Sequence, residues 1–438
     1  MLINFSVGNY KSIRTLQELN MTKTPAKEKA ATNTFSIEVG ESSHSLLTTA
    51  TIYGANASGK SNLVHAVRTM RDIVVSSSKG QIGDGLPYDP FRLSKSTRNE
   101  PTELEAIFIS EGVKYQYGFV YDENRILEEW LYAYPRKKAQ KWFLRAWDVE
   151  NQKYAWQFGR FFTGEKQVWV NSTRPNSLFL STAVQLNSAN LRPVFNWFAH
   201  TLQIATPNGW NINFSTSECE KSERKSKILD FMKKADASIN AIEVSSELFD
   251  PSTIPSDMPN ELKSMIIDKM KGEEVVELKF MKRDDQNDMI PFEVEEESDG
   301  TRRLFSFAGP WLDALDGGRV LVVDELNSNL HPLLVNYLVG FFHSKETNPN
   351  DAQLLFTTHE TSILSQDVFR RDQVWFAEKD RAGASTIYSL SDFKPRKDRD
   401  DLESFYLSGA YGALPVLINE RFPAEDSQCG DDFEEAHF

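Results

Sequence analysis

The spacing of apolar residues changes around position 54, and the change predicts a strand, a loop and a helix. Before this position a short apolar run predicts a buried strand: Leu46, Leu47, Ala50 and Ile52. After position 60 the apolar residues recur at helical spacing: Leu63, Val67, Met70 and Val74. Residues 1–75 are therefore predicted to form strands that lead into a loop and then a helix.

The rest of the chain shows further changes of pattern. Residues 76–100 are rich in Ser, Gly, Pro and Asp and predict a loop. From 101 to 183, short aromatic segments of alternating polarity predict an antiparallel β region. Residues 184–240 predict helices, and 241–300 a mixture of strands and one short helix. Residues 301–390 alternate between helices and strands, which is typical of a parallel α/β sheet.

The loop after the first buried strand carries a phosphate-binding motif. Gly54, Gly59, Lys60 and Ser61 fit G-x-x-x-x-G-K-[ST], the P-loop. Small residues let the backbone N–H groups approach phosphate oxygens, Lys60 reaches the outer phosphates and Ser61 binds Mg²⁺. The alternative is a chance match in an ordinary turn, which the strand–loop–helix context disfavours. The predicted nucleotide-binding residues are Gly54, Ala55, Asn56, Ala57, Ser58, Gly59, Lys60, Ser61 and Asn62.

A second acidic motif follows the apolar run 320–323. That run ends in Asp324 and Glu325, and a continuous apolar run is typical of a central parallel strand. We expect Asp324 to contribute to a Mg²⁺ site and Glu325 to be the general base that polarises the attacking water. The alternative is an ordinary acidic strand end, which becomes less probable once a P-loop is present.

Two further motifs flank these acids. Ser298, Gly300 and Thr301 precede a predicted helix, where a hydroxyl, a backbone N–H and a helix N-terminus form a second anion site or a simple N-cap. Downstream, an apolar strand ends in "TTH", and His359 can hydrogen-bond a terminal phosphate and the attacking water. By itself His359 is equally a structural residue at a strand end, but the order of the motifs favours the functional role.

Together these motifs resemble those of ABC-type ATPases, which include the SMC, RecF and OLD groups. In that group, as here between Lys60 and Asp324, a large insertion separates the P-loop from the acidic strand. Within it the sequence resembles the AAA-domain ATPases of bacterial anti-phage loci, with OLD and PARIS-type ATPases as near relatives. The motifs that carry the resemblance are "INFSVGNYKSI", "GANASGKSN", "ESDGTRR", "VVDELNSNLHP", "FTTHETSIL", "RRDQVWFAEKD" and "YLSGAYGALP".

The resemblance implies a fold, cofactors and partners. The expected fold is α/β: an ABC-type P-loop ATPase head with an antiparallel β-rich lobe, a helical insertion and a parallel α/β lobe. The expected cofactors are ATP and Mg²⁺. A homodimer or higher homo-oligomer is expected, because the loop at Ser298 contacts the γ-phosphate held by the opposite protomer. The other implied partner is an RloB-like, TOPRIM or HNH nuclease or toxin encoded by an adjacent gene.

Three residues depart from the pattern of these relatives. Asp299 stands where the usual signature loop has its first glycine, and Asn327 where relatives often carry aspartate. Both changes weaken the expected coupling between protomers. Ala410 stands where relatives often have arginine, which leaves the role of "YLSGAYGALP" open.

The predicted domain division follows the pattern changes. Residues 1–183 form an N-terminal lobe with the P-loop and the β-rich region, and 184–290 a helical or mixed insertion. Residues 291–392 carry the signature, acidic-strand and histidine motifs. Residues 393–438 form a C-terminal extension, of which 420–438 are strongly acidic.

Composition limits the partners. The net charge of −14 argues against a protein that coats nucleic acid with its whole surface, but the basic stretches 134–145 and 221–234 are either local phosphate contacts or solvated faces. No apolar run is long enough to span a membrane, so no membrane partner is expected and the cytosol is the default location. Cys219 and Cys429 make no metal or disulfide framework.

These observations favour an ATP-hydrolysing subunit of an anti-phage complex that controls a partner effector. One alternative is a RecF- or SMC-like DNA-repair ATPase, although a long coiled coil is absent from the pattern. The other is an ATP-binding scaffold that sequesters a toxin with little turnover.

Overall fold

A computed structural model describes residues 1–205, 210–254, 258–270, 274–393, 395 and 400–415. Its largest sheet has the strand order β10-β9-β8-β7-β6-β1-β2, and all neighbouring strands are antiparallel. The bounds are β1 Leu2–Gly8, β2 Gln17–Asn20, β6 Thr102–Ser110, β7 Val113–Tyr121, β8 Ile126–Tyr134, β9 Gln140–Asp148 and β10 Lys153–Phe158. Burial alternates along β6, as expected for a sheet that packs one face on a core.

The second sheet holds the predicted parallel strands in the order β11-β15-β16-β5-β17-β18. All its pairs are parallel except β17–β18. The bounds are β5 Thr49–Tyr53, β11 Leu202–Ile204, β15 Val320–Val323, β16 Gln353–Thr357, β17 Val374–Lys379 and β18 Ser385–Ser389. Both faces are covered: Val320 and Val322 join one hydrophobic core, and Leu321 and Val323 join the other. This double burial explains the uninterrupted apolar run.

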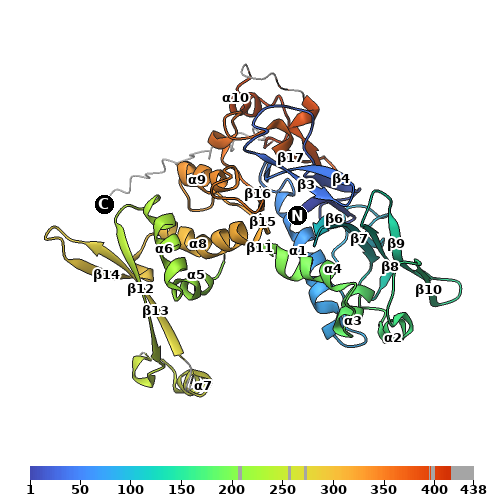
Figure 1. Ribbon diagram of the computed structural model, residues 1–438, viewed down its shortest axis with the longest axis horizontal. Helices are drawn as coiled ribbons and strands as arrows, with labels where there is room; N and C mark the ends of the chain where they lie inside the picture. Colours follow the sequence, from blue (N-terminus) through green and yellow to red (C-terminus); the bar gives the residue numbers. More distant parts are fainter. Residues whose placement is uncertain (206–209, 255–257, 271–273, 394, 396–399, 416–438) are drawn as a thin grey trace, which may run out of the picture.

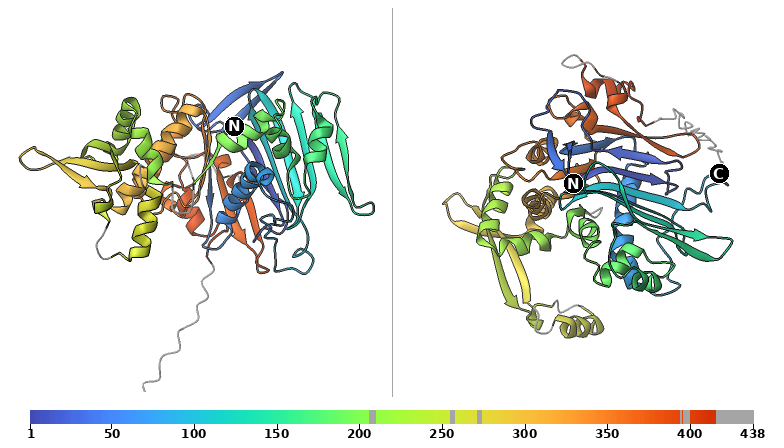
Figure 2. Two further views of the ribbon diagram at one scale, coloured as in Figure 1. Left: turned by 90° about the horizontal axis from the view of Figure 1, so that it is seen from below. Right: turned by 45° about the vertical axis from the view of Figure 1, so that its right-hand side comes forward.

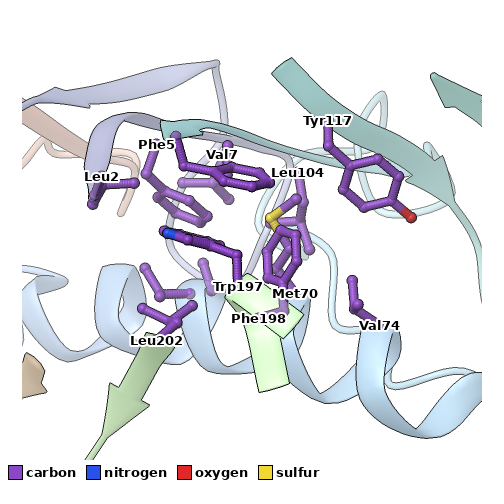
Figure 3. Close-up of a cluster of buried hydrophobic side chains, with 14 of the residues drawn as sticks. Leu2, Phe5, Val7, Met70, Val74, Leu104, Tyr117, Trp197, Phe198 and Leu202 are labelled. Carbon is purple, nitrogen blue, oxygen red and sulfur yellow. The ribbon is translucent and has the colours of Figure 1, made fainter. Parts of the chain in front are cut away.

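Helix α1 (Lys60–Ser76) packs in the core between the two sheets. Figure 3 shows Met70 and Val74 of α1 beneath Phe5 and Val7 of β1 and Leu104 of β6. Trp197 enters the same core from a short π-helix, η2 (Trp197–Thr201), and stacks on Phe108 with ring centroids 4.1 Å apart. Lys60, Leu63 and Val64 are also buried, so the core fixes the start of α1 and with it the end of the preceding loop.

The opposite face of the parallel sheet is covered by helices α8 (Asp299–Gly317) and α9 (Pro332–Phe342). Helices α5 (Ile212–Cys219) and α6 (Ser222–Lys233) pack outside α8 (Figure 1). Beyond them, β12 (Ile239–Leu248), β13 (Glu274–Arg283) and β14 (Met289–Glu293) form a three-stranded sheet. Helix α7 (Asn260–Met270) lies at its far end, and none of its residues is buried. Figure 2 shows the arm formed by β12–β14 and α7 at one end of the molecule and the outer strands of the antiparallel sheet at the other.

The smaller elements complete the described chain. They are β3 Thr34–Val39, β4 Ser42–Leu47, α2 Lys166–Ser172, α3 Phe179–Gln185, α4 Arg192–Asn196 and α10 Leu402–Leu407, with short 3₁₀ turns between. Within the described ranges, no helix is both long and apolar enough to span a membrane.

Most of the predicted elements are confirmed, with three corrections. Leu46 and Leu47 belong to β4, which pairs with β3, and only Ala50 and Ile52 lie on the parallel strand β5. The antiparallel strands end at Phe158, and helices α2 and α3 occupy the rest of the region predicted as β up to 183. Strand β11 falls within a region predicted as helical.

The predicted division at 183, 290 and 392 stays a prediction. The parallel sheet takes β5, β11 and β15 from three of the four predicted segments. The whole acidic stretch 420–438, which includes Cys429, and further parts of the 393–438 extension lie outside the described residues.

Candidate ATP-binding and hydrolysis site

The loop between β5 and α1 has the backbone of a phosphate cradle. Gly54, Ala57 and Gly59 have φ values of 152°, 61° and 107°. Residues other than glycine rarely adopt such backbone conformations. A Cβ at Gly54 would collide with the Ala377 carbonyl oxygen, and one at Gly59 with the Ser385 hydroxyl. Both glycines are therefore required by the close approach of β17 and β18 as well as by the turn.

Lys60 is held across this loop. Its Nζ donates to the carbonyl oxygens of Gly54 at 2.7 Å and Ala55 at 2.9 Å. Burial lowers the pKa of Lys60 to about 8, while the nearby carboxylates of Asp324 and Glu325 oppose that change. A phosphate beside this ammonium would replace two neutral acceptors with a charged one.

A cavity of about 360 Å³ opens over the loop. Its lining combines residues from several distant parts of the chain: Asn56, Ala57, Ser58, Gly59, Lys60, Ser61, Asn62, Glu325, His359 and Lys379. The P-loop, the second acid and the histidine therefore meet at one place, because β5, β15 and β16 are parallel and end at the same edge of the sheet.

A threonine organises the two acids. The Thr357 hydroxyl donates to Asp324 Oδ1 at 2.6 Å and accepts from the Glu325 N–H at 2.8 Å. Glu325 has a φ of 51°, so its backbone no longer follows the strand, in which adjacent side chains point to opposite faces. Its side chain lines the cavity instead. The buried Asp324 and the exposed Glu325 thus share one site although they are adjacent in sequence.

His359 stands opposite Glu325. Its Nε2 lies 3.8 Å from Glu325 Oε1, beyond hydrogen-bond distance. Burial and the neighbouring Lys60 lower the pKa of His359, so its imidazole is neutral at pH 7. Asn327 holds the loop in place, because its Oδ1 accepts from the His359 N–H at 3.2 Å and from Thr358 Oγ1 at 3.0 Å. An aspartate would offer the same acceptor, so Asn327 preserves this contact within the chain.

The predicted signature residues lie elsewhere. Ser298 caps α8 and accepts from the Thr301 N–H at 3.1 Å, as the simple capping interpretation predicts. Gly300 faces the Asn329 carbonyl oxygen, and Asp299 pairs with Arg302. None of Ser298, Gly300 and Thr301 lines the cavity over the P-loop of the same chain.

Residues 402–415 have a place at the site that the sequence did not assign. The Ala413 carbonyl oxygen accepts from the Ala55 N–H at 2.8 Å, so "YLSGAYGALP" braces the P-loop. Ala410 is exposed. Thr357 and Lys379 were also missed as site residues. Two features of the sequence could have indicated them: Thr357 ends an apolar strand, and Lys379 lies in "FAEKD", part of a motif that carries the family resemblance.

The basic stretches are partly neutralised. Arg145 is fully buried 3.6 Å from Glu129 and cannot reach a phosphate outside the protein. On α6, Arg224 pairs with Glu218 and Asp316, and Lys227 pairs with Glu223. Arg136, Lys137 and Lys138 of the first stretch are exposed, so nucleic-acid contact by these segments stays a prediction.

Two oxygen groups fit a magnesium ion that arrives with a nucleotide. The Ser61 hydroxyl lines the cavity, and Asp324 lies close enough to Lys60 to affect its pKa. Hydroxyl, carboxylate and phosphate oxygens are suitable ligands for Mg²⁺. Over the described residues, no group of three or more His, Cys, Asp or Glu side chains is arranged to hold a metal ion by itself.

This fold and site define an ABC-type P-loop ATPase: a P-loop and an acidic strand end on neighbouring parts of a parallel sheet, beside an antiparallel β lobe. The family model described as "AAA domain, putative AbiEii toxin, Type IV TA system" matches residues 50–365. The chain belongs to this family.

Solved structures to which the chain is similar include an SMC head domain from Thermotoga maritima, at 11% identity and a TM-score of 0.42, covering 89% of this chain and 98% of that one. The recombination mediator RecF matches at 13% identity and a TM-score of 0.36, covering 88% of this chain and 98% of that one. An SmcHead bound to the C-winged helix domain of ScpA matches at 13% identity and 0.36, covering 90% and 99%. No curated protein matches the sequence.

Proposed function

We propose that the chain binds and hydrolyses Mg²⁺–ATP and that this cycle controls a partner effector in an anti-phage defence complex. The observation that carries the enzymatic part is the convergence of Lys60, Glu325 and His359 on one cavity from three parallel strand ends. Lys60 supplies a cation for the phosphates, and Glu325 supplies a base for the attacking water. His359 supplies a hydrogen-bond donor or acceptor beside them.

In this mechanism the loop holds the phosphates and Lys60 neutralises charge on the outer ones. Glu325 accepts the proton of the attacking water, and His359 orients the water or the terminal phosphate. In the free protein the pKa of His359 is lowered, and a neutral imidazole leaves the Glu325 carboxylate without a cationic partner that would reduce its basicity. Mg²⁺, bound by Ser61 and Asp324, would neutralise phosphate charge.

Assembly around ATP is part of the proposal. Ser298 and Asp299 are exposed, and Ser298 lies at the N-terminus of the 19-residue helix α8. In a head-to-tail pair, this helix end would contact the terminal phosphate bound to the partner. Within the chain, Arg303 of α8 donates to the Glu325 carbonyl oxygen at 3.2 Å, so movement of α8 is linked to the catalytic loop.

The family description places AAA-domain chains of this kind in a Type IV toxin–antitoxin system and gives the toxin label to the family itself. The separate effector is implied by the resemblance to anti-phage ATPases. We propose that this chain is the ATPase and that the effector is an RloB-like, TOPRIM or HNH nuclease or toxin from an adjacent gene.

The test of this proposal is phage challenge of cells that carry the whole locus, with wild-type or Lys60→Ala protein at matched expression. The proposal predicts protection by the wild type, loss of protection with Lys60→Ala, and co-purification of the neighbouring product with the ATPase. Full protection by Lys60→Ala would contradict a role for the ATP cycle.

A further inference from the structure

A second lysine borders the phosphate cavity. Lys379 is the last residue of β17 and lines the cavity that contains Lys60 and Glu325. It also lines an adjoining cavity of about 280 Å³, formed by Ala55–Ser58, Ala377–Lys379 and Ala413–Pro415. Lys379 and the first half of the P-loop therefore form the boundary between the two cavities.

This lysine is available for a ligand. Its side chain is exposed, and among the described residues it has no ion pair and no hydrogen-bond acceptor. The acids on either side are engaged elsewhere: Glu378 accepts from the Tyr388 hydroxyl at 3.3 Å, and Asp380 accepts from the Ala384 N–H at 2.8 Å. Lys60, in contrast, already contacts two carbonyl oxygens.

The position of Lys379 indicates which part of a nucleotide it meets. In a P-loop, the lysine ammonium marks the outer phosphates. Here the Lys60 ammonium lies against Gly54 and Ala55, at the start of the loop. Ala55 also lines the adjoining cavity with Lys379, so Lys379 lies at the outer-phosphate end of the loop.

The backbone that carries Lys379 is fixed to the P-loop. Lys379 is the register partner of Ser385 in the β17–β18 pair. The Ser385 hydroxyl donates to the Ser58 carbonyl oxygen at 2.6 Å and lies 2.7 Å from Ser12 Oγ. Because this hairpin and the loop are joined by side-chain contacts on a rigid sheet, only the lysine side chain must become ordered when a ligand binds.

We propose that Lys379 is a second phosphate-binding lysine, which contacts the terminal phosphate of ATP beside the first half of the P-loop. The inference rests on the proposed ATPase function. It adds a residue that discriminates ATP from ADP in the same chain, independently of any contact across a dimer.

The test compares Lys379→Ala, Lys379→Gln and Lys379→Arg with Arg381→Ala as the matched control. Arg381 is exposed in the same hairpin and lines neither cavity, so its removal changes the net charge equally. Affinities for ATP, ADP and adenosine are measured by titration calorimetry in Mg²⁺, with the Tm of each variant as a check on folding.

Loss of a charge-assisted contact predicts that Lys379→Ala and Lys379→Gln weaken ATP binding by about tenfold or more and ADP binding by less than about threefold. Lys379→Arg is expected to retain most ATP affinity, and Arg381→Ala to match the wild type. Unchanged ATP affinity in a folded Gln variant would overturn the assignment, and so would equal losses for ATP, ADP and adenosine. Failure of the wild type itself to bind ATP would instead overturn the proposed function.

Discussion

Replacing Thr357 with valine tests how the catalytic acids are positioned. The substitution keeps the shape of the side chain but removes its hydroxyl. Two interactions are lost at a fully buried position: the 2.6 Å bond to Asp324 Oδ1 and the 2.8 Å bond from the Glu325 N–H. The first involves a carboxylate and is worth about 1.5–3 kcal/mol, and the second is worth about 1 kcal/mol. We therefore expect a loss of about 2.5–4 kcal/mol in the free energy of unfolding.

The effect on catalysis should exceed the effect on binding. The Glu325 N–H anchors a residue whose left-handed backbone costs about 1–3 kcal/mol, so without Thr357 the carboxylate loses its fixed direction. We expect kcat to fall by about tenfold to a hundredfold, with ATP affinity within about threefold of wild type because the P-loop is untouched.

The assays are chemical denaturation, ATP titration and steady-state phosphate release. Thr102→Val is the matched control, since Thr102 is also fully buried and donates at 2.8 Å to the Asn9 carbonyl oxygen, in the antiparallel lobe. It should lose about 1 kcal/mol of stability and retain its kcat. A Thr357→Val protein with wild-type kcat would refute the positioning role, whatever its stability.

Three further outcomes are expected. Lys60 has a pKa of about 8 in the free protein, and bound phosphates must raise that pKa. ATP affinity should therefore be nearly constant below pH 7 and fall by up to about tenfold per pH unit above pH 8. Calorimetry in several buffers measures this, and constant affinity to pH 9.5 would contradict it. Mixing inactive Lys60→Ala and Ser298→Arg chains should restore some ATPase activity, because one composite site then carries neither lesion; no recovery in demonstrated mixed dimers, with each mutant–wild-type pair active, would exclude completion in trans. The purified chain should release phosphate from ATP without cutting DNA or RNA. Metal-dependent cleavage by both the wild type and the Lys60→Ala variant would contradict this and would show that the chain has a separate nuclease site.

Local motifs explain what was predictable. The P-loop is one continuous segment, so its residue order alone predicts its cradle, and helix α1 follows from regular apolar spacing. Strand β11 was not predictable, because three residues after a π-helix are too few to establish alternation. It becomes a strand by pairing with β15, which lies more than a hundred residues away.

The missing parts of the site depend on tertiary contacts. Lys379 reaches the cavity only because β17 lies beside β5, a pairing that no local pattern specifies. Arg145 belongs to a basic stretch that could contact phosphates by sequence, but the β8–β9 register places it opposite Glu129. The backbone reversal at Glu325 likewise resolves how two adjacent acids share a site, and it depends on Thr357 from another strand.

The central claim is that this chain hydrolyses ATP with Glu325 as the base. The most direct measurement is single-turnover phosphate release by wild-type and Glu325→Gln protein, with bound ATP quantified in the same samples. An amide cannot accept the proton of the attacking water, so the variant should hold ATP with wild-type affinity and release phosphate at least about a hundredfold more slowly. Wild-type phosphate release by Glu325→Gln would contradict the assignment.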